Sequence, residues 1–195
     1  MKTIGVLNLQ GAVSEHFDMM KIAIERTNLD FEIKSVRYAE EVANCDGIII
    51  SGGESTVIGK LIAERGIGEV IKNQNIPIFG TCAGMVLMAK KVDYDQPILN
   101  LMDYEVKRNA FGSQKDSFEK EIEILGDKFQ GVFIRAPAIE KVYNVDSSNS
   151  SKIEILSEID NKIIAIKQGK NIALSFHPEL TNDTRLHEYY LREVL

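Results

Sequence analysis

Apolar residues in the first half of the chain alternate between short continuous runs and runs with a helical period. Gly47–Ile50 is a continuous β-branched run, which is typical of a strand buried on both faces of a parallel sheet. Upstream of it, apolar side chains recur at intervals of four, three and four residues, as on one face of an amphipathic helix, at Val13, Phe17, Met20 and Ile24. This alternation predicts a parallel sheet with helices on both faces. The other elements expected in this half are the strands Thr3–Leu9, Phe31–Val36 (near a sheet edge) and Ile76–Phe79, and the helices Val57–Arg65, capped by Ser55 or Thr56, and Gly68–Asn73.

The second half of the chain carries short apolar runs that follow one another too closely for crossover helices. Tight turns at Asp160-Asn161 and Gly169-Lys170 join the last three runs, which should therefore form antiparallel pairs. The segments expected here are the strands Tyr104–Arg108, Ser117–Ile124, Phe133–Ala136, Ala138–Val142, Ile153–Leu156, Ile163–Lys167 and Ile172–Phe176, a serine-rich turn at Asp146–Ser151, and a final helix at Asp183–Leu195. The two halves together predict a single α/β domain over residues 1–195, with a mixed, mostly parallel central sheet and a small antiparallel portion.

Composition narrows the class of protein. A chain of 195 residues with 44% hydrophobic and 27% charged residues is typical of a soluble globular domain. A net charge of −6 without any basic cluster argues against a nucleic-acid partner, and the sequence lacks the long apolar stretch of a membrane span. The N-terminal residues enter a strand pattern without the apolar region of a signal peptide, and two cysteines make no disulfide framework. We therefore expect a cytoplasmic protein with reduced thiols.

The stretch Gly80-Thr81-Cys82-Ala83-Gly84 lies between a predicted strand and an apolar helix-forming run. Strand, sharp glycine-flanked turn and helix are the context of a nucleophile elbow, which presents the Cys82 sulfur at the carboxyl end of a strand. The start of the following helix would favour the thiolate form. The stretch alone also fits an ordinary turn with a small buried cysteine. Residues elsewhere in the chain are needed to choose between these two interpretations.

The segment His177-Pro178-Glu179 follows the last predicted strand. Residues two apart in an extended segment point the same way, so His177 can act as the base for a cysteine nucleophile while Glu179 orients its ring. Alone, such a segment is a common surface turn. His16 and His187, the other two histidines, lie on predicted helices without ligand-like spacing, so we expect them at the surface and expect no metal site.

Acyl transfer also requires backbone N–H groups that stabilise the developing oxyanion. The Ala83 N–H, directly after the nucleophile, is one candidate. The pair Gly52-Gly53, which follows the buried strand, is the other, although it also fits a plain strand-to-helix turn. The dinucleotide-binding glycine pattern is absent after this strand and after the first one.

Six stretches together carry a family resemblance that runs from the first strand to the last helix. They resemble the glutaminase subunits of pyridoxal 5′-phosphate synthase, a branch of the class I (triad) glutamine amidotransferases. The elbow and His-Pro-Glu are common to the whole superfamily, whereas the first, fourth and fifth stretches are specific to the vitamin B6 branch. Ser51 departs from the pattern, since many relatives carry proline there. The stretches are Leu9-Gln10-Gly11-Ala12, Ser51-Gly52-Gly53-Glu54-Ser55-Thr56, Phe79-Gly80-Thr81-Cys82-Ala83-Gly84, Arg108-Asn109-Ala110-Phe111-Gly112, Phe133-Ile134-Arg135-Ala136-Pro137 and Ser175-Phe176-His177-Pro178-Glu179.

The resemblance implies a three-layer, flavodoxin-like fold and hydrolysis of L-glutamine to L-glutamate and ammonia without a cofactor. Cys82 would attack the side-chain amide to give a γ-glutamyl thioester, His177 would protonate the departing ammonia, and Glu179 would orient His177. Carried over position by position, the substrate-binding residues are Gly52, Gly53, Glu54, Arg108, Ile134 and Arg135. A zwitterionic amino acid needs a cationic and an anionic partner, which Arg108 or Arg135 and Glu54 can supply. Without the resemblance, either arginine could equally be a solvated or structural residue.

The resemblance also implies a partner, a (β/α)8-barrel synthase subunit that receives the ammonia within a large hetero-oligomer. We expect the Gln10-Gly11-Ala12 loop and the first helix near that interface, because the loop falls at the same sheet edge as Cys82. The alternatives are a glutaminase serving another synthase, such as imidazole glycerol phosphate synthase, and a non-catalytic α/β module, peptidase or chaperone with a similar elbow. The specific stretches argue against the first alternative, and the intact Cys82, His177 and Glu179 set argues against an inactive module.

Overall fold

The computed structural model describes residues 1–112, 116–143 and 152–194. Within these ranges, ten strands form one large sheet and two form a small one. The large sheet contains β1 (Lys2–Leu7), β2 (Phe31–Val36), β3 (Gly47–Ile50), β4 (Ile78–Thr81), β5 (Lys91–Val92), β6 (Tyr104–Lys107), β9 (Ala138–Val142), β10 (Ile153–Ile159), β11 (Lys162–Gln168) and β12 (Asn171–Leu174). Its strand order is β2-β1-β3-β4-β12-β11-β9-β6-β5, with β10 paired to β11.

The half of the sheet that carries the elbow is parallel. Strands β2, β1, β3, β4 and β12 are paired in parallel, so their carboxyl ends meet at one edge of the sheet. β2 lies at the outer edge, and β3 is buried along its whole length. The predicted parallel arrangement is confirmed.

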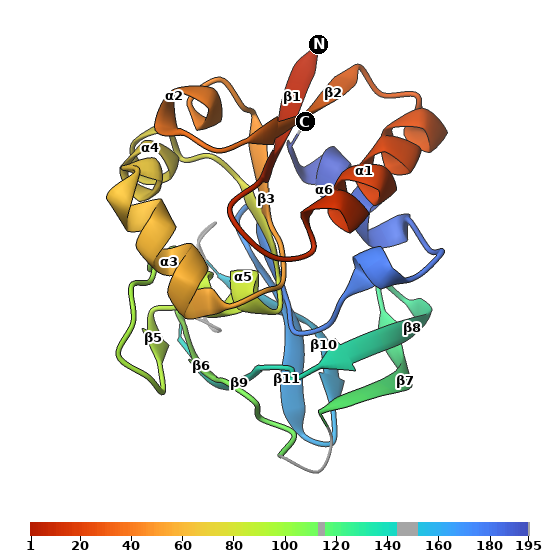
Figure 1. The fold of residues 1–195 in the computed structure, drawn as a ribbon. Helices are drawn as coiled ribbons and strands as arrows, with labels where there is room; N and C mark the ends of the chain where they lie inside the picture. The colour runs from red at the N-terminus through yellow and green to blue at the C-terminus, as the bar shows by residue number, and fades with distance from the viewer. Residues whose placement is uncertain (113–115, 144–151, 195) are drawn as a thin grey trace.

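The other half is mainly antiparallel, as the short spacing of the runs predicted. β11 pairs antiparallel with β10, β12 and β9, and β9 pairs antiparallel with β6. A separate antiparallel hairpin is formed by β7 (Ser117–Ile124) and β8 (Asp127–Ile134). This hairpin packs beside β10 and the segment that follows β12 (Figure 1).

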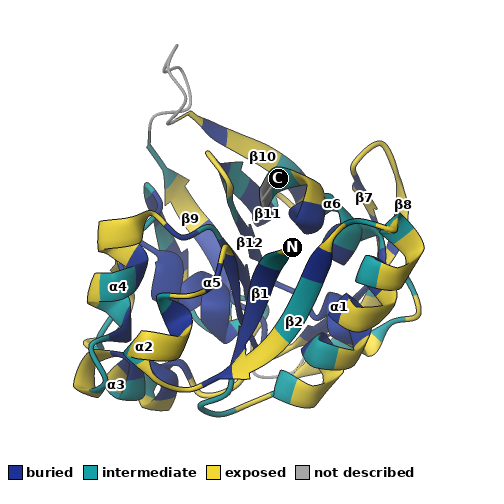
Figure 2. Cartoon of the chain, turned by 90° about the horizontal axis from the view of Figure 1, so that it is seen from above, coloured by how far each residue is buried: buried dark blue, intermediate teal, exposed yellow. Residues whose placement is uncertain are grey.

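Helices cover both faces of the large sheet. α1 (Val13–Thr27) and α6 (Arg185–Val194) pack together on one face, and α2 (Ala39–Val42), α3 (Ser55–Glu64), α4 (Ile67–Gln74) and α5 (Ala83–Met88) lie on the other (Figure 1). Successive residues of a strand point to opposite faces, so Ile48 and Ile50 enter the core under α3–α5 while Ile49 enters the core under α1 and α6. Figure 2 shows buried strands between helices whose outer surfaces are exposed. None of the helices in the described ranges is long and apolar enough to cross a membrane.

Several predicted boundaries need correction. β4 begins two residues later than predicted, because Pro77 has no amide hydrogen for the ladder and contributes only its carbonyl, which accepts from the Ile48 N–H. α3 begins at Ser55 with Glu54 at the cap position, and no side chain caps its N-terminus, so neither Ser55 nor Thr56 is the N-cap. Ser55 Oγ is instead 3.0 Å from Gln96 Oε1.

Other differences concern elements that the pattern does not resolve. The strand predicted at Phe133–Ala136 is the end of the longer β8, which stops at Ile134 because Arg135 has a φ of 42°. The four-residue helix α2 is not predicted, being too short to show a period. The turn predicted at Asp146–Ser151 and the terminal residue Leu195 lie outside the described residues.

Candidate active site

Cys82 occupies a strained turn between β4 and α5. Its φ of 50° and ψ of −101° are rare for a residue with a side chain, and backbone hydrogen bonds hold it there: its N–H donates to the Leu174 carbonyl at 2.8 Å, and its carbonyl accepts from the Val86 N–H at 3.2 Å. The flanking glycines are required by packing, since a Cβ on Gly84 would lie 2.3 Å from the Ile50 carbonyl oxygen. The predicted elbow geometry is therefore present.

The sheet brings His177 to Cys82 because β12 and β4 are parallel neighbours. Both strands end at the same edge, and the chain after β12 is fixed by a hydrogen bond from the His177 N–H to the Val132 carbonyl at 2.8 Å. Glu179 follows in a short 3₁₀ turn, η1 (Pro178–Leu180). The two side chains are buried, and His177 Nδ1 lies 2.7 Å from Glu179 Oε1. This contact is the one that an orienting carboxylate makes with a catalytic imidazole.

The charge of His177 is set by these neighbours. Burial acts to lower the pKa of His177, but its contacts with Cys82 and Glu179 outweigh burial and raise the pKa to about 10. The ring is therefore an imidazolium at neutral pH. Its Nε2 has no hydrogen-bond partner among the described residues, while the Cys82 thiol is directed at the Ile134 carbonyl oxygen, 3.7 Å from Sγ. Rotation of the thiol away from Ile134 is needed to pair it with Nε2, and such loose geometry is common before substrate binds.

A cavity of about 660 Å³ opens over this edge of the sheet. Of the ten residues that the sequence nominates, nine line it, and the tenth, Glu179, lies behind His177, out of the cavity. The nine are Gly52, Gly53, Glu54, Cys82, Ala83, Arg108, Ile134, Arg135 and His177.

Gly52 and Gly53 form the wall closest to the reacting groups. A Cβ on Gly52 would lie 2.4 Å from His177 Cε1 and 3.4 Å from Cys82 Cβ, so only glycine fits there. The Gly52 carbonyl accepts from the Ala12 N–H at 3.1 Å, which ties this loop to the one after β1. Gly53 has a φ of 155° and lies against Gln10.

Gln10 is a site residue whose contribution the sequence reasoning misses. Its Oε1 accepts from the Glu54 N–H at 2.7 Å and lies against Gly53, so Gln10 fixes the glycine loop while lining the cavity. The sequence motif that contains it, Gln10-Gly11-Ala12, is interpreted above as part of the family resemblance and of a partner interface, and not as a contact within the site. A glutamine directly after a buried strand, at the edge where the other strands end, is the available signal.

Two arginines line the cavity. The guanidinium of Arg108 lies over the Tyr94 ring, 4.1 Å from its centroid, and Arg108 Nε is 3.6 Å from Asp93 Oδ1, too far for a hydrogen bond. Arg135 is exposed, and its N–H donates to the Asp116 carbonyl at 2.5 Å. Both arginines line the cavity, which makes them the cationic candidates for binding a carboxylate there.

The prediction that His16 and His187 lie at the surface is wrong. Both have no exposed surface, because α1 packs on α6 and their facing sides carry the two rings inward. The helical period could have predicted that His16 is buried. His16 precedes Met20 by four residues and Ala23 by seven, so it shares their buried face. The lack of a metal-ligand spacing argues against a metal site but says nothing about burial.

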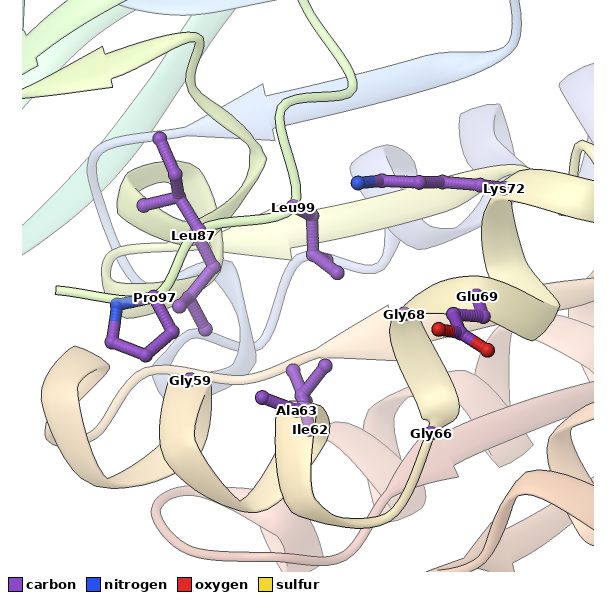
Figure 3. A pocket seen from close by; sticks show the side chains of 11 residues that line it. Gly59, Ile62, Ala63, Gly66, Gly68, Glu69, Lys72, Leu87, Pro97 and Leu99 are labelled. Carbon is purple, nitrogen blue, oxygen red and sulfur yellow. The ribbon is translucent and has the colours of Figure 1, made fainter.

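Two other features of the molecule do not share this chemistry. Cys45 is buried with Sγ 3.4 Å from the Glu41 carbonyl oxygen, and burial raises the pKa of its thiol to about 11, so it is a packed thiol. A cavity of about 240 Å³ lies between α3, α4, α5 and residues 97–99 (Figure 3). Ile62, Leu87 and Leu99 point into it, and its charged groups, Glu69 and Lys72, come from α4.

Comparison with known proteins adds three findings. The model of the SNO glutamine amidotransferase family matches residues 6–195. A protein of Methanobrevibacter smithii named pyridoxal 5′-phosphate synthase subunit PdxT is 63% identical over 100% of this chain and 98% of its own length. A protein of the same name from Methanothermobacter thermautotrophicus is 56% identical over the same shares.

Solved structures agree on the fold. A crystal structure described as a glutamine amidotransferase has a TM-score of 0.85 at 39% identity and covers 98% of both chains. The crystal structure of a putative GMP synthase protein from Thermoplasma acidophilum has a TM-score of 0.65 at 15% identity, over 100% of this chain and 92% of its own, which is a likeness of fold alone.

Proposed function

Because the chain belongs to the SNO glutamine amidotransferase family, we propose that it hydrolyses L-glutamine to L-glutamate and ammonia as the glutaminase subunit of a pyridoxal 5′-phosphate synthase. The names of its full-length relatives support this role. One structural observation carries the chemistry: a strained cysteine and a carboxylate-paired imidazole share the edge of one cavity. Residues 1–195 would act as a single amidotransferase domain in the cytoplasm.

The proposed reaction uses Cys82, His177 and Glu179 as a triad. The Cys82 thiolate attacks the side-chain amide carbon of glutamine, and the tetrahedral intermediate collapses as His177 gives its Nε2 proton to the departing ammonia. This leaves a γ-glutamyl thioester and a neutral imidazole. His177 then takes a proton from water, whose oxygen attacks the thioester and releases glutamate and the thiolate. Glu179 holds Nδ1–H throughout, which keeps Nε2 toward the sulfur.

The oxyanion of both intermediates would be bound by backbone N–H groups. Ala83 supplies one at the start of α5, and the Gly52-Gly53 peptide, which lies against both Cys82 and His177, supplies the other. Removal of one such donor typically costs roughly 10²–10³ in rate. No resident cofactor is invoked, because the thiol, the imidazole and water account for every bond that changes.

The amino-acid end of glutamine would lie toward the cavity mouth. Its α-carboxylate would pair with Arg108 or Arg135, and its ammonium group with Glu54. Ile134 would add backbone contacts, consistent with its carbonyl facing the Cys82 sulfur.

The partner would be a (β/α)8-barrel synthase subunit within a hetero-oligomer, seated over the same opening. The rim supports a docking surface, since Ile134 and Leu180 line the cavity yet leave 37% and 43% of their surface exposed. The loop of Gln10, Gly11 and Ala12 and the first turns of α1 belong to the same rim. Ammonia released beneath a docked partner would reach it without escaping to solvent.

The test measures pyridoxal phosphate formation by this chain with its barrel synthase, with either glutamine or ammonium as the nitrogen source. Cys82→Ala should abolish synthesis from glutamine and leave synthesis from ammonium intact, because only the glutaminase step needs the thiol. The matched control is Cys45→Ala, which removes the other cysteine and should retain both. Glutamine-dependent synthesis in the Cys82→Ala complex would refute the proposed nucleophile, and its absence with the unsubstituted protein would refute the proposed function.

A further inference from the structure

Behind the proposed triad, the two remaining histidines form a buried polar chain with Glu179. His16 Nε2 lies 3.2 Å from Glu179 Oε2 and 2.9 Å from Thr81 Oγ1, and His16 Nδ1 lies 3.0 Å from His187 Nε2. All four side chains are at most 5% exposed. All three histidines of the protein are thereby joined through one carboxylate, whose Oε1 contacts His177 and whose Oε2 faces His16.

Both buried rings are neutral. Burial, together with the nearby His187 and His177, holds the pKa of His16 well below its ordinary value, and burial lowers the pKa of His187 to about 3. Between two neutral imidazoles in contact, one nitrogen must donate and the other must accept. The hydrogen bond between His16 and His187 can therefore run in two directions. The contacts at the outer nitrogens, His16 Nε2 and His187 Nδ1, show which direction is favoured.

In the first direction, both rings carry hydrogen on Nε2. His16 Nε2–H then faces both Thr81 Oγ1 at 2.9 Å, which accepts the hydrogen bond, and the negative Glu179 Oε2 at 3.2 Å, which it attracts electrostatically. His187 Nε2–H donates to His16 Nδ1, and His187 Nδ1 is left as a bare lone pair. In the second direction, the His16 Nε2 lone pair would face a carboxylate oxygen at 3.2 Å, and the hydrogen on His187 Nδ1 would have no acceptor among the described residues. A buried donor without a partner and two opposed lone pairs are both unfavourable, so the first direction holds.

We propose that His16, as its Nε2–H tautomer held by His187, is a positioning residue that fixes the Glu179 carboxylate against His177. Apart from this approach of His16, Glu179 Oε2 has no hydrogen-bond partner among the described residues, so without His16 the carboxylate has one anchor instead of two. A carboxylate free to turn would release Nδ1 of His177 and with it the direction of Nε2 toward Cys82. His16 stays outside the substrate cavity and acts only through Glu179. The catalytic part of this inference rests on the proposed glutaminase function, whereas the tautomers do not.

The first experiment reads the ring protons directly. The full chain, labelled with ¹⁵N in histidine, contains only three rings, so correlation of ring nitrogens with carbon-bound ring protons at pH 7 gives a spectrum in which each can be assigned by substitution. We expect one cationic ring, His177, and two neutral rings, both protonated on Nε2. Hydrogen on Nδ1 of His16, or a cationic His16, would overturn the proposal whatever the protein catalyses.

The second experiment tests the positioning role of His16 by measuring kcat and KM for glutamine hydrolysis in the complex with the synthase. His16→Leu should lower kcat for glutamine hydrolysis about 10–100-fold, the range found when a group that orients an active side chain is removed, while KM changes less than about twofold. His16→Gln, whose amide N–H can occupy the place of Nε2–H, should restore most of kcat.

The control is Tyr190→Phe on α6. It deletes a buried hydroxyl 2.8 Å from the Pro77 carbonyl oxygen, in the same core but without a link to Glu179, and should lower stability without lowering kcat. Unchanged kcat in His16→Leu, or an equal loss of kcat in Tyr190→Phe, would contradict a positioning role. Absence of glutaminase activity in the unsubstituted complex would instead count against the proposed function and leave the tautomer result standing.

Discussion

The two faces of the central sheet bury different kinds of side chain. Under α3, α4 and α5 the core is mainly aliphatic and sulfur-containing, and it borders the cavity of Figure 3. Under α1 and α6 the core surrounds Phe79 with two buried histidines, which need partners of their own and find them in Thr81 and Glu179. The sheet thus separates a face that supplies stability from a face whose polar interior reaches the active groups.

The largest effect is expected where the polar face meets the cavity, at Glu179. Glu179→Gln keeps the shape of the side chain but removes one of the two groups, Cys82 and Glu179, that raise the pKa of His177, so that pKa should fall and kcat should drop by roughly 10²–10⁴. The measurements are glutamine hydrolysis in the complex and titration of the His177 ring by NMR. A pKa of His177 that stays near its original value would mean that Glu179 does not contribute to the charge of His177.

A core substitution on the opposite face should separate stability from activity. Ile62 is a buried residue of α3, and Ile62→Ala should lower the free energy of unfolding by about 2–4 kcal/mol through lost burial and the cavity left behind. Because Ile62 belongs to the core on the side away from Glu179, kcat measured below the unfolding transition should stay within about twofold. A proportionate loss of kcat would show that the two faces are coupled through the sheet. Chemical denaturation and steady-state rates on the same preparation make the comparison.

The same contrast explains what the sequence could predict. Cys82 and His177 could be placed at one sheet edge in advance because each lies in a local pattern, an elbow and a strand end, and the carboxyl ends of parallel strands meet at one edge. The strands of the antiparallel half were also predictable, since tight turns fix neighbouring strands together.

Contacts between distant elements were not predictable in this way. The period of α1 places His16 inward, but nothing in its own helix shows that His187, 171 residues further along, packs against it. The bond from Glu54 N–H to Gln10 Oε1 likewise joins two loops whose approach depends on the order of β1 and β3 in the sheet. The hydrophobic period of an element predicts which of its sides is buried. It does not predict which polar side chain of another element a buried polar residue will contact.

The polar face should also make folding stability fall in acid. In the unfolded chain His187 takes up a proton near its ordinary pKa of 6.5, whereas the folded protein resists protonation of His187 until about pH 3. The unfolded state therefore binds more protons in this window, and the free energy of unfolding should decrease as pH falls, by about 1.4 kcal/mol per pH unit from this residue. His187→Phe, which keeps a ring against Phe79, should remove that slope. Identical acid slopes in the two proteins, measured by denaturation between pH 6 and pH 4, would assign the acid sensitivity elsewhere.

The smallest effect is expected from filling the cavity of Figure 3. This change tests whether the face under α3, α4 and α5 affects stability alone. Ala63 lines this cavity on α3, and Ala63→Leu would bury additional apolar surface there, adding about 1 kcal/mol and raising Tm by about 2–4 °C. Ala63→Gln, of similar length but polar, is the control and should not gain. Because none of Cys82, His177 and Glu179 lines this cavity, kcat should be unchanged. Loss of glutaminase activity on filling it would mean that α3 must move during turnover, and the face would then serve chemistry as well as stability.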